Sequence, residues 1–345
     1  MRGSISVFFL FLLCKFIQAG DSTEIRYAAE LLRIPAGSDI AAMGDAGVSL
    51  LRRASSAFWN PSAPAFLKKY EVSVEAADLY EGLSQQGCFA VGIPVDGDLG
   101  ASLLYVPFFS GDIVMYDSLE GTYLERLTNP EMRAVGAGTG VFQNYQNALF
   151  LTLAKLFPFI LPRAPGVSFP LPLDIAVGGS IKGYWQSMNP AGKIRMGMGL
   201  NLDAGIEGII GVDYDFKKKE VSRKVALGAS WRNILPSRIV WINSPRDYQE
   251  PFEFEQFYGI SYTDISGNLY ADWAVTFALE KAHGLIYHEG IEAELWDIVA
   301  IRAGLSGETP SVGAGVHYRN WFMDYAFRFD DLAWSFLRIT MGMRF

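Results

Sequence analysis

Only three histidines occur in this chain of 345 residues, and none stands in a catalytic motif. His283, His288 and His317 have no serine or cysteine nucleophile in a recognisable motif nearby, so ordinary polar roles are favoured over a metal site or a triad. We therefore expect no enzymatic activity and no cofactor. The remaining candidates are for contact with a ligand, because their side chains are apolar or cationic: Met43, Val48, Arg52, Arg53, Phe58, Trp59 and Arg302.

Whether these side chains lie close together depends on the strands and helices that carry them. The last ten residues form the most clearly predicted strand. Residues 336–345 alternate strictly, with large apolar side chains on one face of a strand and Arg338, Thr340, Gly342 and Arg344 on the other. This pattern indicates a strand between lipid and water. A soluble sandwich strand would also alternate, but it would rarely turn two arginines inward. The ending resembles the carboxy-terminal signal of outer-membrane β-barrels, which implies that the barrel assembly machinery recognises Phe345.

The same alternation recurs along the chain and predicts fourteen strands. A charge on the lipid face costs roughly 2–4 kcal/mol for Arg or Lys at mid-depth, so the charged faces should line a lumen. An even number of antiparallel strands places both termini on one side, which is the periplasmic side in bacteria. The predicted strands are 70–78, 86–95, 99–109, 145–154, 173–185, 199–212, 223–231, 254–263, 268–280, 284–295, 298–305, 311–318, 321–329 and 335–345.

The segment 155–172 fits this pattern poorly. It is apolar and rich in proline, and it falls on the predicted periplasmic side, where connections are normally short. A membrane-hugging insertion and a miscounted strand would both explain it, and the sequence does not decide between them.

Residues 1–19 read as a secretory signal peptide, with Arg2, an apolar run over 7–13 and Ala19 before the expected cleavage site. No later stretch reaches the ~20 apolar residues of a spanning helix, so entry into a membrane requires a barrel. The formal net charge of −8 argues against nucleic acid as a partner. Cys88 is the only cysteine after the signal, which excludes an intramolecular disulfide.

The segment before the first strand carries the most diagnostic motif. It contains Met43-Gly44, Ala46-Gly47-Val48, Ala54-Ser55-Ser56-Ala57 and Trp59-Asn60-Pro61. This resembles the amino-terminal region of FadL-like outer-membrane proteins, and most closely their PorV/PorQ-type branch. Ser62, Ile40 and the pair Arg52-Arg53 depart from the usual pattern, which leaves the fold in place but weakens any charge-based comparison at 52 and 53.

The resemblance implies three parts: a signal peptide over 1–19, a helical hatch over 20–69, and a transmembrane barrel over 70–345. A fourteen-strand barrel is too wide for wall side chains to fill, so something must occupy its lumen. In FadL-like proteins the hatch does so and moves to admit ligand. The hatch motif residues are Met43, Gly44, Gly47, Asn60 and Pro61. From the residues alone, Asn60-Pro61 is a turn, either a plain loop or part of a gate.

Two functions remain open. The first is outer-membrane transport of hydrophobic small molecules, fatty-acid-like by family resemblance, with ligand bound between hatch and wall. The second is a PorV-like docking or shuttle role in protein secretion and surface attachment, which would make secretion-system proteins its partners. In both cases outer-membrane lipid surrounds the barrel. Fold resemblance does not separate the two, because function lies in sites rather than folds.

Overall fold

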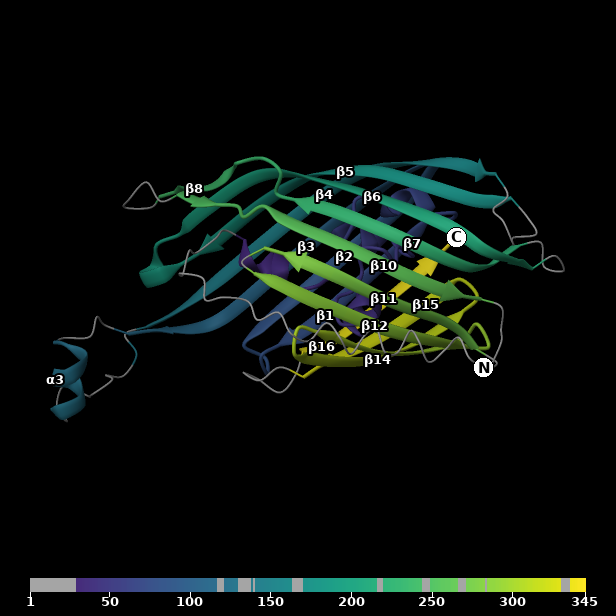
Figure 1. Cartoon of the computed structure of the whole chain (residues 1–345). Coiled ribbons are helices and arrows are strands. Elements are labelled where there is room, and N and C mark those ends of the chain that lie inside the picture. The colour runs from purple at the N-terminus through teal and green to yellow at the C-terminus, as the bar shows by residue number, and fades with distance from the viewer. Residues whose placement is uncertain are drawn as a thin grey trace.

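The computed structural model describes residues 29–116, 121–129, 138, 140–162, 170–215, 220–243, 249–265, 271–282, 284–329 and 336–345. The predicted signal peptide lies outside these residues. Fourteen antiparallel strands form one closed barrel, since β1 pairs with β16 and β5 pairs with β6 (Figure 1). The predicted fold class is thereby confirmed. Among the described residues, no helix has the length and apolar character of a membrane-spanning helix.

Each predicted strand is present, although β3 to β7 are longer than expected. The barrel strands are β1 (Glu71–Leu79), β2 (Ser84–Asp96), β3 (Leu99–Met115), β4 (Gly140–Leu161), β5 (Leu171–Met188), β6 (Arg195–Asp215), β7 (Glu220–Arg232), β10 (Glu255–Asp264), β11 (Ala271–Lys281), β12 (Leu285–Leu295), β13 (Val299–Ser306), β14 (Thr309–Tyr318), β15 (Trp321–Arg328) and β16 (Phe336–Arg344). The extensions are polar at several positions, such as Ser110 and Asn144, where alternation of hydrophobicity gives no signal. Backbone pairing nevertheless continues there, because Ser110 lies opposite Asn144.

The two ends of the barrel differ. The terminal end is the one where β1 begins and β16 ends, and there Tyr70 and Phe345 exchange backbone hydrogen bonds and stack at 5.9 Å between ring centroids. The loop end carries the long connections 116–139 and 233–254. It also carries the short strands β8 (Arg238–Ile242) and β9 (Gln249–Pro251), which extend the sheet beside β6, and helix α3 (Tyr123–Thr128) beyond the wall (Figure 1).

The alternating faces lie as the sequence predicts. Ile301, Met323 and Tyr325 are exposed on the outside of the wall, whereas Arg302, Asp324 and Arg338 are buried inside. Because a charge is unfavourable against hydrocarbon and can pair inside a lumen, this sorting fixes which face of each strand turns inward.

Both ends of the segment 155–172 are part of the wall, and residues 163–169 between them lie outside the described residues. β4 continues to Leu161 and pairs with β5 from Leu171, so residues 155–161 and 171–177 form the end of one long hairpin. The strand count near this segment is therefore correct. Pro158 is tolerated because β3 begins at Leu99, opposite Lys155, so the β4 edge has no partner strand at Pro158 that requires an N–H donor.

Residues 29–67 run through the lumen from the loop end to the terminal end (Figure 1, purple). They contain short turns of helix rather than long ones: Glu30–Arg33, Ser38–Ala41, Ala54–Phe58 and Ala63–Phe66, all 3-10 helix except the second. We call this segment the hatch. Nearly all of its residues after Pro35 are buried, so the hatch supplies the core that the barrel wall lacks.

Candidate functional site

The hatch is docked on wall positions that have no side chain. A Cβ at Gly100 would overlap the Pro64 carbonyl, one at Gly205 the Asn60 side chain, and one at Gly228 the Val48 carbonyl. The same holds where the hatch meets Gly178, Gly290, Gly304 and Gly313. Glycine at these positions lets the hatch backbone approach the wall closely. Wall hydroxyls add hydrogen bonds to hatch carbonyls, from Ser261 to Ser49 at 2.6 Å and from Thr276 to Ala46 at 2.8 Å.

The motif residues hold this docked position. Asn60 donates to the carbonyls of Val48 at 2.9 Å and Ile206 at 3.1 Å, so its side chain ties one part of the hatch to another and to β6. Gly44 has a φ of 65° and donates its N–H to Ser311 at 3.0 Å. A Cβ at Gly47 would press on Ile40 and Trp59, and Pro61 contacts the wall at Gly178. These residues therefore fasten the hatch to the wall.

A cavity of about 580 Å³ opens between hatch and wall at the loop end. Its apolar lining includes Leu31, Ile34, Phe108 and Ile286, and three arginines lie at its walls. Each of these arginines forms an ion pair with a carboxylate: Arg33 with Glu280 at 3.0 Å, Arg328 with Asp45 at 2.8 Å, and Arg338 with Glu75 at 2.6 Å. This volume falls within the range of small-molecule sites, about 300–1,000 Å³.

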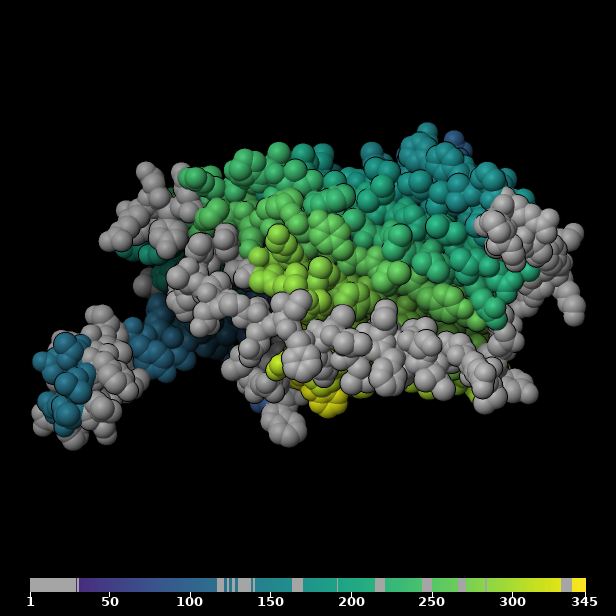
Figure 2. Space-filling model, viewed as in Figure 1, coloured from purple at the N-terminus to yellow at the C-terminus, as the bar shows by residue number. Residues whose placement is uncertain are grey.

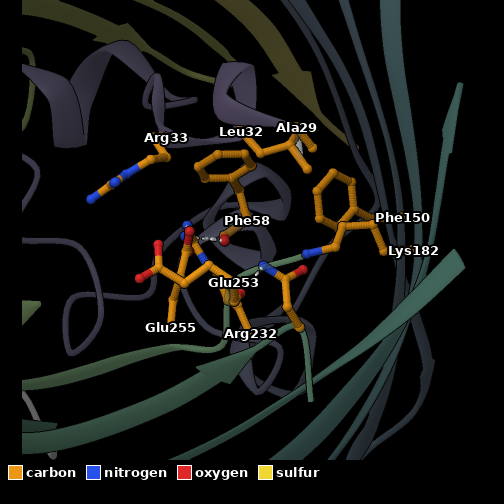
Figure 3. A pocket seen from close by; sticks show the side chains of 10 residues that line it. Ala29, Leu32, Arg33, Phe58, Phe150, Lys182, Arg232, Glu253 and Glu255 are labelled. Carbon is orange, nitrogen blue, oxygen red and sulfur yellow. Dashed lines mark hydrogen bonds and ion pairs between the residues drawn. The ribbon is translucent and has the colours of Figure 1, made fainter. Parts of the chain in front are cut away.

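Two smaller voids lie next to this cavity and share Arg33 with it. One, of about 110 Å³, is lined by Phe58, Trp59 and His288 among others. The other, of about 10 Å³, appears in Figure 3, where Phe58 and Arg232 meet. The Arg232 guanidinium lies 4.7 Å from the centroid of the Phe58 ring and donates to the Phe58 carbonyl at 2.6 Å. These contacts hold Phe58 and Arg232 together beside the void.

A separate cavity of about 380 Å³ opens at the terminal end and shares no lining residue with the loop-end cavity. Arginines dominate its lining: Arg52, Arg53, Arg302, Arg319 and Arg344. Behind them lies an interlocked ion-pair network. Arg302 bonds Glu292 at 2.6 Å and Asp324 at 2.7 Å, while Arg53 bonds Asp39 at 3.0 Å and Asp324 at 2.7 Å. Arg52 also pairs with Glu292.

Arg53 shows how tightly this network holds its charges. Burial by itself would lower the pKa of Arg53, but the carboxylates of Asp324, Asp39 and Glu71 outweigh burial and raise that pKa above its ordinary value. The guanidinium also lies 3.7 Å from the centroid of the Phe322 ring. Arg53 therefore stays cationic and joins the hatch to β14 and β15 at the terminal end.

The structure divides the predicted site residues into three groups. Phe58 and Trp59 line the small voids on the loop-end side, whereas Arg52, Arg53 and Arg302 line the terminal-end cavity. Met43 and Val48, each 1% exposed, pack against wall glycines. Sequence reasoning did not single out Arg33, Arg328 or Ile286. The sequence contains part of the information, because alternation of polar and apolar residues places Arg328 on the lumen face. Alternation does not give the position of a residue along the barrel axis.

Comparisons with known proteins bear on the fold alone. No family model matches the chain, and no curated protein matches it. Solved structures with a similar fold include the Ralstonia pickettii toluene transporter TbuX, at 10% identity and a TM-score of 0.48, covering 90% of this chain and 98% of that one. The Pseudomonas putida toluene transporter TodX follows at 10% and 0.46, covering 90% and 97%. A Pseudomonas aeruginosa FadL homologue has 12% and 0.39, covering 88% and 94%. These values do not assign the chain to a family.

Proposed function

We propose that this chain is an integral outer-membrane barrel that takes up hydrophobic small molecules and holds them first in the loop-end cavity. The observation that carries the proposal is the cavity itself. Apolar residues of the hatch and of the wall meet there without filling the space between them, whereas the second large cavity, at the terminal end, is lined mainly by charged side chains. Room of this size next to a plug that is otherwise buried is what ligand binding requires.

The exterior of the barrel supports the membrane location. Large apolar side chains such as Leu151, Leu227 and Met341 are more than half exposed on the outer face. In water such a surface would be unfavourable, at roughly 25 cal/mol per Å² of apolar area, whereas hydrocarbon covers it without that cost. Aromatic side chains gather at the terminal-end rim, including Tyr70, Trp296, Trp321 and Phe345, where an interfacial girdle belongs.

The lining suggests a ligand with an apolar body and an anionic group, such as a fatty acid. Leu31, Ile34 and Phe108 offer apolar contact, and Arg33 and Arg328 lie beside them with side chains about one-quarter exposed. A guanidinium offers five N–H donors in a fixed fork, so a partly exposed arginine can bind a ligand carboxylate in addition to its structural partner. The terminal-end arginines are the second cationic group that such a ligand would meet.

Binding of a fluorescent fatty acid to the purified full-length protein tests this proposal. Ile286 lies at the junction of the loop-end cavity and the 110 Å³ void, so Ile286→Trp should fill the junction and weaken binding at least tenfold. Ile291→Trp is the matched control, since Ile291 lies on the same strand, β12, and faces outward. Equal affinity in both variants, or no binding to the unmodified protein, would rule out the cavity as the ligand site.

The PorV-like docking role is the alternative proposal. Its support is the large apolar outer surface of β4 to β6, which offers a protein partner a place to bind. Copurification of secretion proteins after gentle extraction, together with a lumen empty of lipid and no binding of the fatty-acid probe, would favour docking over transport.

A further inference from the structure

The barrel wall is much taller on one side. β4, β5 and β6 have 22, 18 and 21 residues, whereas β13, β15 and β16 have 8, 8 and 9. In Figure 1 β4, β5 and β6 run along the upper part of the barrel, and in Figure 2 the teal part of the upper edge belongs to them. The outer face of this tall sector is therefore longer than that of the opposite sector.

The outward row of β6 has no charged residue between Met196 and Val212. At ~3.3 Å per residue and a strand tilt of ~40°, this row is ~40 Å high, against an apolar band of ~25 Å on outer-membrane barrels. Lipid can cover only part of such a row. The remainder must lie in water or against another protein.

Ion pairs show at which end the excess lies. Arg223 bonds Asp264 at 3.0 Å and Asp213 at 3.2 Å, and these groups must lie at or beyond the lipid boundary of the terminal end. Because Asp213 follows Val212 directly, the ~25 Å band that begins there ends near Leu202. The apolar residues beyond it form a patch at the loop end, which we call the β6–β8 patch: Ile194, Met198, Leu200, Val240 and Ile242.

We infer that the β6–β8 patch and the lipid-facing wall of β5 and β6 below it form a contact surface for a second copy of this chain. All five patch residues are at least 44% exposed, which is unusual for adjacent apolar side chains outside a membrane. The outward rows of β5 and β6 carry no charged residue, and the exposed Arg238 on the outward row of β8 lies at the edge of the patch, so a symmetric pair of these rows needs few matching ion pairs. A face ~40 Å high and ~15–20 Å wide would bury ~600–800 Å² per copy, close to the ~800 Å² of standard interfaces.

The outer glycines of this sector fit close approach by another wall. A Cβ at Gly183 or Gly208 would have no described neighbour within 4 Å, so nothing described in the chain itself requires glycine there. Gly183 lies opposite Leu200 in the β5–β6 pairing, at the lower edge of the patch. A bulky residue at Gly183 would therefore leave the barrel intact and push a neighbouring copy away.

Cysteine cross-linking of the full-length protein in its membrane tests the inference. Met198 lies in the patch and Met323 lies on β15, across the barrel, and their exposed fractions match at 45% and 46%. Cys88 is buried and does not interfere. Met198→Cys should give a cross-linked dimer at least fivefold more abundant than Met323→Cys. Adding Gly183→Phe to Met198→Cys should abolish the dimer while the barrel keeps its heat-modifiable mobility.

Equal cross-linking of the two variants, or a dimer that survives Gly183→Phe in a folded barrel, would refute the pairing. A cross-link at Met198→Cys to a different protein would refute the second copy as occupant. This outcome is independent of ligand uptake, because the patch lies on the outside of the wall and the cavities lie within it.

Discussion

The hatch has two sides that differ in how they use charge. On the loop-end side, Arg33 pairs with Glu280 and Arg328 pairs with Asp45, and both arginines remain about one-quarter exposed beside an open apolar cavity. On the terminal-end side, Arg53 and Arg302 share Asp324 and are almost fully buried. Partly exposed ion pairs contribute less to stability than fully buried ones, because separating a buried pair leaves an uncompensated charge. The terminal-end side therefore anchors the hatch, and the loop-end side leaves room for a ligand.

The largest expected effect comes from breaking the anchor. Arg302→Ala would leave Glu292 and Asp324 buried beside one arginine fewer, and loss of one partner of a buried pair costs about 3–5 kcal/mol. The same change at Arg33 should cost less, because Glu280 keeps His288 as a partner at 3.3 Å and the Arg33 side chain is already one-quarter exposed. Unfolding midpoints of the two variants in one detergent would measure the difference. Equal midpoints would mean that the ion pairs on the loop-end side stabilise the protein as much as those on the terminal-end side.

A second test concerns the glycines under the hatch. Gly205→Ala would drive a methyl group into the Asn60 side chain, and such overpacking costs about 1–3 kcal/mol or displaces the hatch. Gly208→Ala on the same strand faces open space and should change stability by less than about 0.5 kcal/mol. Ion conductance in planar bilayers reports displacement, so we expect leakage from Gly205→Ala alone. A closed, stable Gly205→Ala barrel would show that the hatch is not held by close contact.

The sequence predicted the barrel well for a physical reason. Alternation with period two is a local property, so the faces of β11 or β15 follow from a few neighbouring residues. The position of a residue along the barrel axis depends instead on how all the strands pair. Arg302 and Arg338 both turn inward, yet one lines the terminal-end cavity and the other lines the loop-end cavity.

The hatch was harder to predict in detail for a related reason. Met43 and Val48 are apolar, and apolar residues suit a ligand pocket or a packed contact equally well. What decides is the wall glycine opposite each of them, more than 170 positions away in the chain. A glycine has no side chain from which its contacts could be predicted, so this contact is found only in the three-dimensional structure.

The smallest expected effect concerns pH and the Arg53 anchor. Burial by itself lowers the pKa of Arg53, and the carboxylates of Asp324, Asp39 and Glu71 raise it further than burial lowers it. A base whose pKa is raised by folding adds stability below its unfolded pKa and loses that contribution only as the pH rises through the folded value. For an arginine this lies above pH ~12, so the Arg53 contribution should stay constant between pH 7 and 11.

Arg53→Lys makes this constancy measurable. A lysine has an ordinary pKa of ~10.4, so its charge would be lost within the alkaline range in which the arginine keeps its charge. The unfolding midpoint of Arg53→Lys should lie below that of the protein at pH 7, because an ammonium group does not reproduce the contacts of the guanidinium with Asp39, Asp324 and Phe322, and the difference should widen above pH ~10. Other groups titrate in both proteins alike and cancel in the difference. A constant difference across this range would mean that the cation at position 53 does not anchor the hatch, which would remove the contrast between its two sides.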